Sequence, residues 1–163
     1  MIDFKQYVTE GGGRSDLSLL FADRKAFDAA IQNISEPFRN ASINKVVALD
    51  ALGFLFGSLV AKELGVGLVL FRKEGKIPVE KKIVKFNDYS KSEKVFEVAS
   101  DAIKASDNVL IVDEWSETGS QIKAAISLVE QCGGVVKGVS CFNIDKSVLE
   151  DKVLSKYQLH SVL

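Results

Sequence analysis

Short apolar runs alternate with amphipathic segments along most of the chain. Three of these runs have the hydrophobicity of strands buried on both faces of a parallel sheet: residues 46–49, 66–71 and 109–112. Residues 135–142, which follow Gly133 and Gly134, predict another strand. Between the runs, apolar residues recur at spacings of three and four, which predicts helices over residues 23–39, over residues 54–64 and after Gly119. Strands that alternate with helices imply right-handed crossovers. The pattern therefore predicts an α/β fold with a mostly parallel central sheet flanked by helices.

Other segments give weaker signals. Residues 95–98 predict a further strand and residues 101–105 a short helix, while Gly11, Gly12 and Gly13 predict a turn near the start of the chain. The polar, lysine-rich stretch 74–94 is long for a plain connection, so it predicts either a hairpin excursion or a flexible lid. Residues 144–163 have no pattern that predicts a role.

Composition limits the fold to one domain and excludes several classes of partner. The chain has 163 residues, of which 47% are hydrophobic, so residues 1–163 are expected to form a single domain with a sizeable core. A net charge of −1 favours neither nucleic acid nor a membrane as partner. Cys132, Cys141 and His160 lack the spacing of a metal site. With neither a leader pattern at its start nor a membrane-length apolar run, the protein is expected to be cytoplasmic.

Candidate binding residues are most concentrated in the run of residues 109–120, V-L-I-V-D-E-W-S-E-T-G-S. Its apolar strand is expected to stop at Asp113 and Glu114, and a helix follows the polar loop. Unpaired backbone N–H groups and the positive end of the helix dipole meet at such a loop, where a phosphate can bind beside the hydroxyls of Thr118 and Ser120. Ionised carboxylates accept hydrogen bonds, and a sugar diol donates two. The run therefore predicts a sugar-phosphate site, and the alternative is an ordinary strand-to-helix turn with solvated acids.

Two other predicted strands also end in polar groups. Asp50 follows the strand over residues 46–49, and Arg72 follows the strand over residues 66–71. The carboxyl ends of parallel strands lie along one edge of a sheet. Asp50, Arg72 and Asp113 are therefore expected to approach one crevice.

The run over residues 109–120 also resembles the ribose-phosphate motif of the type I phosphoribosyltransferases, an apolar strand followed by two acids and a T-G loop. Residues 46–78 and 16–31 are similar to the adenine members of that family. The resemblance implies the type I fold, with a small or reduced N-terminal hood at residues 1–22. It implies a transferase of purine salvage, in which a purine base, adenine favoured, displaces pyrophosphate from 5-phosphoribosyl 1-pyrophosphate (PRPP) to give a nucleoside monophosphate. Mg²⁺ is the implied cofactor, and a homodimer is the implied assembly.

The resemblance also implies roles for individual residues. Asp113 and Glu114 would be the catalytic pair that holds the ribose hydroxyls. The positions expected to bind the ribose phosphate also include Ser116, Glu117, Thr118, Gly119, Ser120 and Gln121. The residues expected to bind pyrophosphate are Asp50, Ala51, Leu52, Gly53, Arg72, Lys73 and Lys76. Arg14 is expected at the base, and Mg²⁺ is expected to be held through PRPP and water rather than by the protein.

Several positions depart from the family's pattern. Leu52 stands where adenine members usually carry an arginine, and residues 13–15 lack the aromatic side chain that usually stacks on the purine. Glu117 places a carboxylate beside the phosphate loop, where it either points outward or fills the loop as a phosphate mimic. Trp115 is either a packing residue or a stacking platform. Leu52 and Glu117 leave open a second function, a non-catalytic PRPP- or nucleotide-binding regulatory protein.

Overall fold

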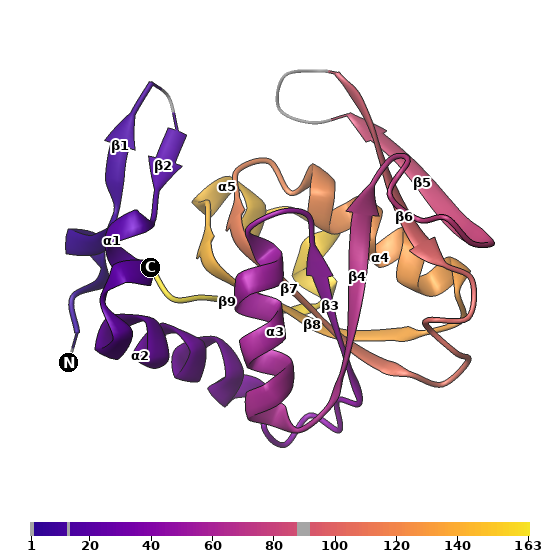
Figure 1. The fold of residues 1–163 in the computed structure, drawn as a ribbon, viewed down its shortest axis with the longest axis horizontal. Coiled ribbons are helices and arrows are strands. Elements are labelled where there is room, and N and C mark those ends of the chain that lie inside the picture. The colour runs from indigo at the N-terminus through magenta and orange to yellow at the C-terminus, as the bar shows by residue number, and fades with distance from the viewer. Residues whose placement is uncertain (1, 13, 88–91) are drawn as a thin grey trace.

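The computed structural model describes residues 2–12, 14–87 and 92–163. Within these residues the chain forms a seven-stranded sheet with helices on both faces (Figure 1). From edge to edge, the strands are β5 (Lys81–Asn87), β6 (Glu93–Ala99), β4 (Gly67–Lys73), β3 (Lys45–Leu49), β7 (Asn108–Ser116), β8 (Val135–Ile144) and β9 (Gln158–Ser161). Strands β4, β3, β7, β8 and β9 are parallel, whereas β6 is antiparallel to both β4 and β5. The prediction of a mostly parallel sheet flanked by helices is confirmed.

The helices cover the sheet and lead into it. They are α1 (Ser18–Ala22), α2 (Arg24–Ser35), α3 (Gly53–Leu64), α4 (Ser120–Gln131) and α5 (Lys146–Leu149), with the 3₁₀ turns η1 (Phe4–Tyr7), η2 (Glu36–Phe38) and η3 (Leu154–Lys156). A separate antiparallel hairpin of β1 (Thr9–Gly11) and β2 (Arg14–Asp16) stands beside the N-terminal helices, apart from the main sheet (Figure 1). None of the described helices is long and apolar enough to cross a membrane.

Local signals explain where the long helices begin and end. The Asp23 carboxylate accepts hydrogen bonds from the backbone N–H groups of Lys25 and Ala26, which caps the first turn of α2. Helix α2 ends at Ser35 and tightens into η2, because Pro37 has no N–H with which to continue it. The predicted continuation to residue 39 is therefore wrong. Helix α3 ends at Gly65, whose φ of 68° is the left-handed conformation that glycine favours.

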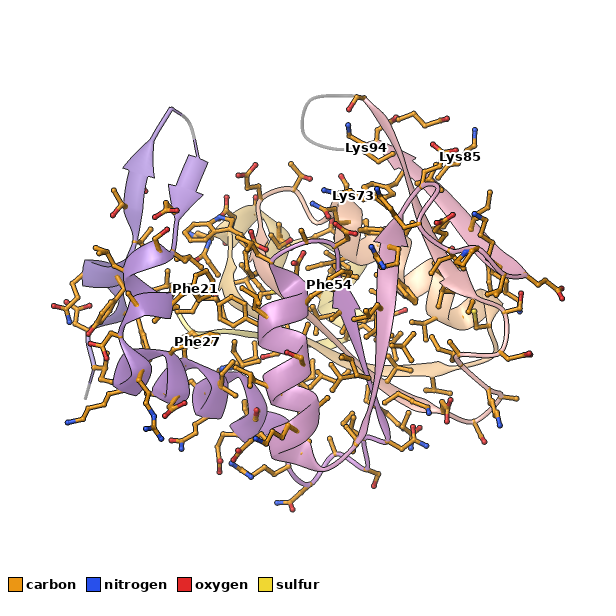
Figure 2. All side chains as sticks on the ribbon, viewed as in Figure 1. Phe21, Phe27, Phe54, Lys73, Lys85 and Lys94 are labelled. Carbon is orange, nitrogen blue, oxygen red and sulfur yellow. The ribbon has the colours of Figure 1, made fainter. Side chains whose placement is uncertain are left out.

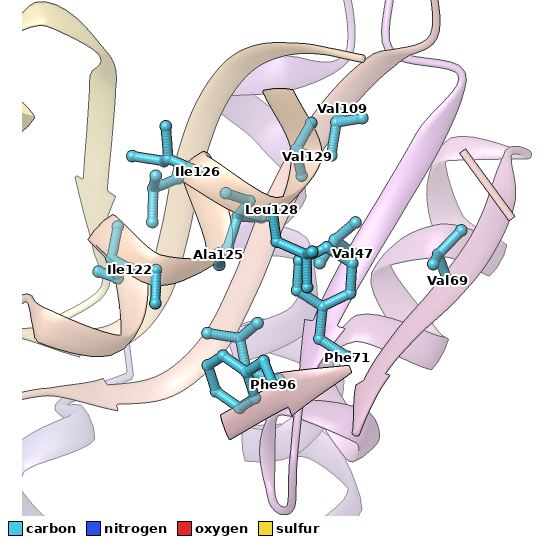
Figure 3. Close-up of a cluster of buried hydrophobic side chains, with 14 of the residues drawn as sticks. Val47, Val69, Phe71, Phe96, Val109, Ile122, Ala125, Ile126, Leu128 and Val129 are labelled. Atoms are coloured by element: carbon cyan, nitrogen blue, oxygen red, sulfur yellow. The ribbon is translucent and has the colours of Figure 1, made fainter. Parts of the chain in front are cut away.

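The sheet is buried on both faces by two hydrophobic clusters. Figure 3 shows part of the first, which contains Ile122, Ala125 and Val129 of α4 together with Val47 of β3 and Phe71 of β4. The second cluster lies on the opposite face, where α2, α3 and the N-terminal segment cover the sheet. Neighbouring residues of a strand point to opposite faces, so both must be apolar. This two-sided burial is the reason that the strands appear in the sequence as continuous apolar runs.

Strands β7 and β4 extend beyond the apolar runs that predicted them. Strand β7 continues through the two acids to Ser116, which is paired with Ile144 of β8, so the prediction that this strand stops at Asp113 and Glu114 is wrong. Strand β4 includes Lys73, which is paired with Phe96 of β6. In both cases a neighbouring strand provides backbone partners past the end of the apolar run.

The weakly predicted segments have mixed outcomes. Strand β6 includes the predicted strand at residues 95–98, and it pairs antiparallel with β5 to form a hairpin within the stretch for which the sequence left a hairpin or a lid open. The predicted helix at residues 101–105 is wrong, since these residues form turns and bends. The Lys104 backbone N–H there donates to the Asp107 carboxylate, which competes with helical pairing. Residues 144–163, which carried no prediction, contribute α5, η3 and the edge strand β9.

Candidate active site

A cavity of about 440 Å³ opens at the carboxyl ends of β3, β4 and β7. Its lining residues are Asp50, Ala51, Leu52, Lys73, Phe86, Lys94, Asp113, Glu114, Trp115 and Gln121. Figure 2 shows Lys73 at the end of β4 and Lys94 at the start of β6, at the same end of the molecule. The strand ends thus bring Asp50 and Asp113 to one crevice, as expected of ligand sites in open α/β sheets.

The two acids of β7 lie in a poorly solvated part of this cavity. Asp113 is 5% exposed and Glu114 is half-buried. Burial, and then the charge of Glu114, raise the pKa of Asp113 well above its ordinary value, while the Glu114 backbone N–H and Lys73 act in the opposite direction. Burial raises the pKa of Glu114 to about 7, against the lowering effects of Lys73 and the Gly53 backbone N–H. Glu114 is therefore poised to change its charge near neutral pH.

Gly53 allows helix α3 to approach these acids. A Cβ at this position would lie 2.7 Å from Asp113 Oδ1 and 3.3 Å from the Val112 carbonyl oxygen, so any side chain would collide with β7. The turn that precedes Gly53 contains a cis peptide bond between Asp50 and Ala51. The first turn of α3 thus brings its backbone N–H groups to the same cavity as the two carboxylates.

The expected pyrophosphate cations occupy different places. Lys73 lines the cavity, and its Nζ lies 3.9 Å from Asp50 Oδ1. Arg72 Nε lies 3.4 Å from Asp50 Oδ2, and the guanidinium stands over the Phe54 ring, 5.6 Å from its centroid. Lys76 is exposed. Arg72 and Lys76 are not among the lining residues, so of these three cations Lys73 alone faces the cavity.

Glu97 of β6 holds the turn that follows Lys73. Its side chain is 1% exposed and accepts hydrogen bonds from Lys81 Nζ at 2.5 Å, from the Ile77 backbone N–H at 2.6 Å and from the Lys76 backbone N–H. Burial raises the pKa of Glu97, but the hydrogen bonds from Lys81 and from the backbone of Ile77, Lys76 and Gly75 together lower it below its ordinary value. An ionised carboxylate in the sheet therefore anchors the connection between β4 and β5.

We expect Glu97→Gln to lower the free energy of unfolding by about 2 to 3 kcal/mol, because hydrogen bonds from a charged amine and from the turn's backbone weaken together. Urea denaturation at pH 7 measures this change. Glu93→Gln on the same strand is the matched control, since the Lys85–Glu93 ion pair is exposed and worth at most about 1 kcal/mol. Equal losses in the two variants would contradict the anchoring role.

The predicted phosphate loop lies between β7 and α4. Gly119 has a φ of 73°, and a Cβ there would lie 2.8 Å from Leu154 Cδ1, so the loop packs tightly on the C-terminal segment. The hydroxyls of Thr118 and Ser120 are hydrogen-bonded to each other at 3.0 Å. The Ser116 carbonyl accepts the Asp145 backbone N–H.

Glu117 does not fill this loop. Its side chain is exposed, and within the described part of the chain it makes no hydrogen bond or ion pair. The outward orientation is therefore the one that the structure has. Of the predicted loop residues, Gln121 lines the cavity, whereas Ser116, Glu117, Thr118, Gly119 and Ser120 are not among its lining residues.

Some of the lining residues carry no signal in the sequence. Phe86 and Lys94 come from the β5–β6 hairpin, and nothing in that lysine-rich stretch distinguishes them from their neighbours. Trp115 packs against the second hydrophobic cluster, as one of its two predicted roles requires, and it also lines the cavity. The backbone of Arg14 belongs to β2, and its side chain lies outside what the structure describes.

We expect the free energy of unfolding to fall as pH rises from about 4.5 to about 7, because in this window the folded protein keeps the Glu114 proton that the unfolded chain has lost. Glu114→Gln should remove about 2 to 3 kcal/mol of this fall. Urea denaturation at pH 5 and pH 8 measures the free energy of unfolding of both proteins. Relative to the wild type, Glu114→Gln should gain stability at the higher pH. Glu117→Gln is the control, since its side chain is exposed. The same gain in both variants would contradict the assignment to Glu114.

Together these features give an α/β protein with a cavity at the strand ends that is lined by a carboxylate pair and a lysine. A family model of the phosphoribosyl transferase domain matches residues 20–157. The chain belongs to this family, its fold is the type I phosphoribosyltransferase fold, and it is a phosphoribosyltransferase.

Similar proteins support this assignment over nearly the whole chain. An adenine phosphoribosyltransferase of Clostridium botulinum is 35% identical over 161 residues, which cover 98% of this chain and 92% of that protein. The adenine phosphoribosyltransferase of Rhodothermus marinus superposes with a TM-score of 0.90 at 30% identity, over 98% of this chain and 95% of the other. The Saccharomyces cerevisiae enzyme, solved with an imino-altritol bisphosphate and adenine, has a TM-score of 0.85 at 29% identity, over 98% and 96%. These enzyme relatives favour a transferase over a non-catalytic binding protein.

Proposed function

We propose that this protein is an adenine phosphoribosyltransferase of purine salvage, which joins adenine to C1′ of PRPP and releases pyrophosphate and AMP. The carboxylate pair Asp113–Glu114, set in the cavity at the end of β7, is the observation that carries the proposal. Adenine as the base is supported by the names of the relatives and by the adenine bound in the yeast enzyme.

The proposed roles rest on the family resemblance and on the chemistry of each group. Asp113 and Glu114 hold the ribose hydroxyls, because carboxylates accept hydrogen bonds from a diol. The turn 50–53 and Lys73 bind pyrophosphate, through backbone N–H groups and a positive charge. The loop 116–121 binds the 5′-phosphate at the N-terminus of α4. Residues 1–22 are proposed as the reduced hood over the base.

The reaction exchanges one bond at C1′ for another. Adenine N9 forms its bond to C1′ while the C1′–oxygen bond to pyrophosphate breaks, its electron pair leaves with pyrophosphate, and N9 loses its proton. Positive charge develops on the ribose during this exchange, beside Asp113 and Glu114. Carboxylates already fixed at that place stabilise the transition state more than the substrate, and Lys73 does the same for the departing pyrophosphate.

Mg²⁺ is proposed as the cofactor, which when bound would neutralise charge on pyrophosphate. Within the described residues no cluster of three or more His, Cys, Asp or Glu side chains could hold a metal ion. The carboxylates that line the cavity are hard oxygen acceptors that suit the water shell of this cation, and PRPP and water would hold the ion itself. A cytoplasmic homodimer is proposed from the family resemblance.

The test of this function is direct. We expect the purified protein, incubated with Mg²⁺ and PRPP, to convert adenine to AMP, and to convert hypoxanthine, guanine and xanthine much more slowly. Chromatography of the nucleotides measures the products, and a chelator of Mg²⁺ should stop the reaction. No nucleotide from any of these bases would remove the proposal.

A further inference from the structure

The segment that carries α5 and η3 packs on the loop between β7 and α4. A Cβ at Gly119 of the loop would lie 2.8 Å from Leu154 Cδ1 and 3.2 Å from Val148 Cγ1. Leu154 and Val148 are buried, and they belong to the same hydrophobic cluster as Ile122 of α4. The loop therefore rests on side chains of this segment and has no room to move toward them.

Asp151 joins this segment to the helix that follows the loop. Its Oδ2 lies 2.5 Å from the Nζ of Lys123, near the start of α4, and its Oδ1 accepts the backbone N–H groups of Val153 and Leu154 at 2.9 and 3.1 Å. Hydrogen bonds from Lys123 and from the Leu154 backbone lower the pKa of Asp151 below its ordinary value. One ionised carboxylate thus holds both α4 and the turn that presents Leu154 to the loop.

The position of Lys123 calls for such a partner. A positive charge near the N-terminus of a helix is unfavourable, because the positive end of the helix dipole lies there. The Lys123 backbone N–H donates to the Gly119 carbonyl at 2.9 Å, so the residue that meets Asp151 is also hydrogen-bonded to the loop. At the start of the loop, the Ser116 carbonyl accepts the Asp145 backbone N–H at 2.9 Å. Contacts from the chain that follows β8 thus reach both ends of the loop.

We propose that Asp151 is a positioning residue for the loop that binds the 5′-phosphate. This inference rests on the proposed function, because it needs the phosphate of PRPP at the loop 116–121. Asp151 acts through Lys123 and Leu154 rather than on the substrate, and these two residues keep the loop in one conformation before the phosphate arrives. A loop that is already ordered loses less entropy when its ligand binds.

Ligand binding and kinetics test the positioning role together. We expect Asp151→Ala to weaken binding of ribose 5-phosphate about tenfold in calorimetry and to raise the KM for PRPP by a similar factor, while kcat and the KM for adenine change little. Asp151→Glu, which keeps the charge, should restore part of the loss. The matched control is Glu150→Ala, which should change none of these quantities, since the Lys146–Glu150 pair is exposed and lies within the one helix α5. Unchanged binding of ribose 5-phosphate in folded Asp151→Ala, or a fall in kcat without a rise in the KM for PRPP, would overturn the proposal.

Hydrogen exchange in the wild type provides a measurement that needs no variant and decides if Asp151→Ala does not fold. Ribose 5-phosphate should slow exchange in the loop 116–121 and also at the backbone N–H groups of Leu154 and Ser155, which are hydrogen-bonded to Asp151. Protection confined to the loop would overturn the proposal. A wild type that neither binds ribose 5-phosphate nor forms AMP would remove the proposed function instead, so the two failures are distinguishable.

Discussion

Asp113→Asn is expected to lower kcat/KM for PRPP by about 10²- to 10³-fold while the protein remains as stable as the wild type at neutral pH. Burial and the neighbouring Glu114 raise the pKa of Asp113 well above its ordinary value, so the fold disfavours a charge at this position and should tolerate asparagine, which is uncharged and of the same size. Its side-chain oxygen can still accept the Glu114 backbone N–H, as Asp113 Oδ1 does at 2.9 Å. Positive charge that develops on the ribose requires the ionised carboxylate, which asparagine cannot provide.

Steady-state kinetics and urea denaturation together test this separation of activity from stability. The matched control is Asp101→Asn, since Asp101 is exposed in the turn after β6, and it should leave both quantities unchanged. Full activity in Asp113→Asn would show that catalysis does not require a negative charge at position 113. A large loss of stability would instead contradict the expectation that burial disfavours a charge at position 113.

Gly53→Ala is expected to lower the free energy of unfolding by about 1 to 3 kcal/mol and to reduce activity by more than about tenfold. The new Cβ would lie 2.7 Å from Asp113 Oδ1 and 3.3 Å from the Asp113 Cα, so α3 must move away from β7. The neighbouring atoms belong to a buried carboxylate and to backbone, which cannot swing aside as a flexible side chain can. Any such movement also displaces the turn 50–53 from the cavity.

The same measurements on a second glycine separate this collision from the general effect of replacing glycine. In Gly67→Ala the new Cβ would meet Lys45 Cδ and Nζ at 3.3 Å, and the end of that flexible side chain can shift at little cost. Stability and activity should therefore stay close to the wild type. If Gly53→Ala behaved in the same way, the close approach of α3 to Asp113 would not matter for the site.

Much of the fold could be predicted because its strands and helices have local hydrophobic patterns in the sequence. The strands of a sheet covered on both faces must be apolar on both sides, and β3 and β7 show this in the sequence. The acids at residues 113 and 114 interrupt such a run, which makes them visible as a site. For α2 the sequence predicts one boundary correctly and the other wrongly. Asp23 marks the start of the helix, but Pro37 ends it earlier than its apolar pattern predicts.

The rest of the site could not be predicted, because it depends on pairing between distant strands. Phe86 and Lys94 reach the cavity because β5 folds back on β6 at the edge of the sheet. Glu97 looks like a solvent-facing charge in the sequence, but it is buried because the turn after β4 offers it a lysine and backbone N–H groups. Arg72 and Lys76, two of the predicted cations, do not line the cavity.

The sequence by itself determined the α/β architecture, the family and the acidic pair at the end of β7, because these depend on local hydrophobic patterns and on contiguous motifs. Only the tertiary structure decided which cations and aromatic rings share the cavity with that pair. It also decided the raised pKa values of Asp113 and Glu114, since these come mainly from burial. Burial and strand pairing are properties of the assembled sheet, and no single stretch of sequence contains them.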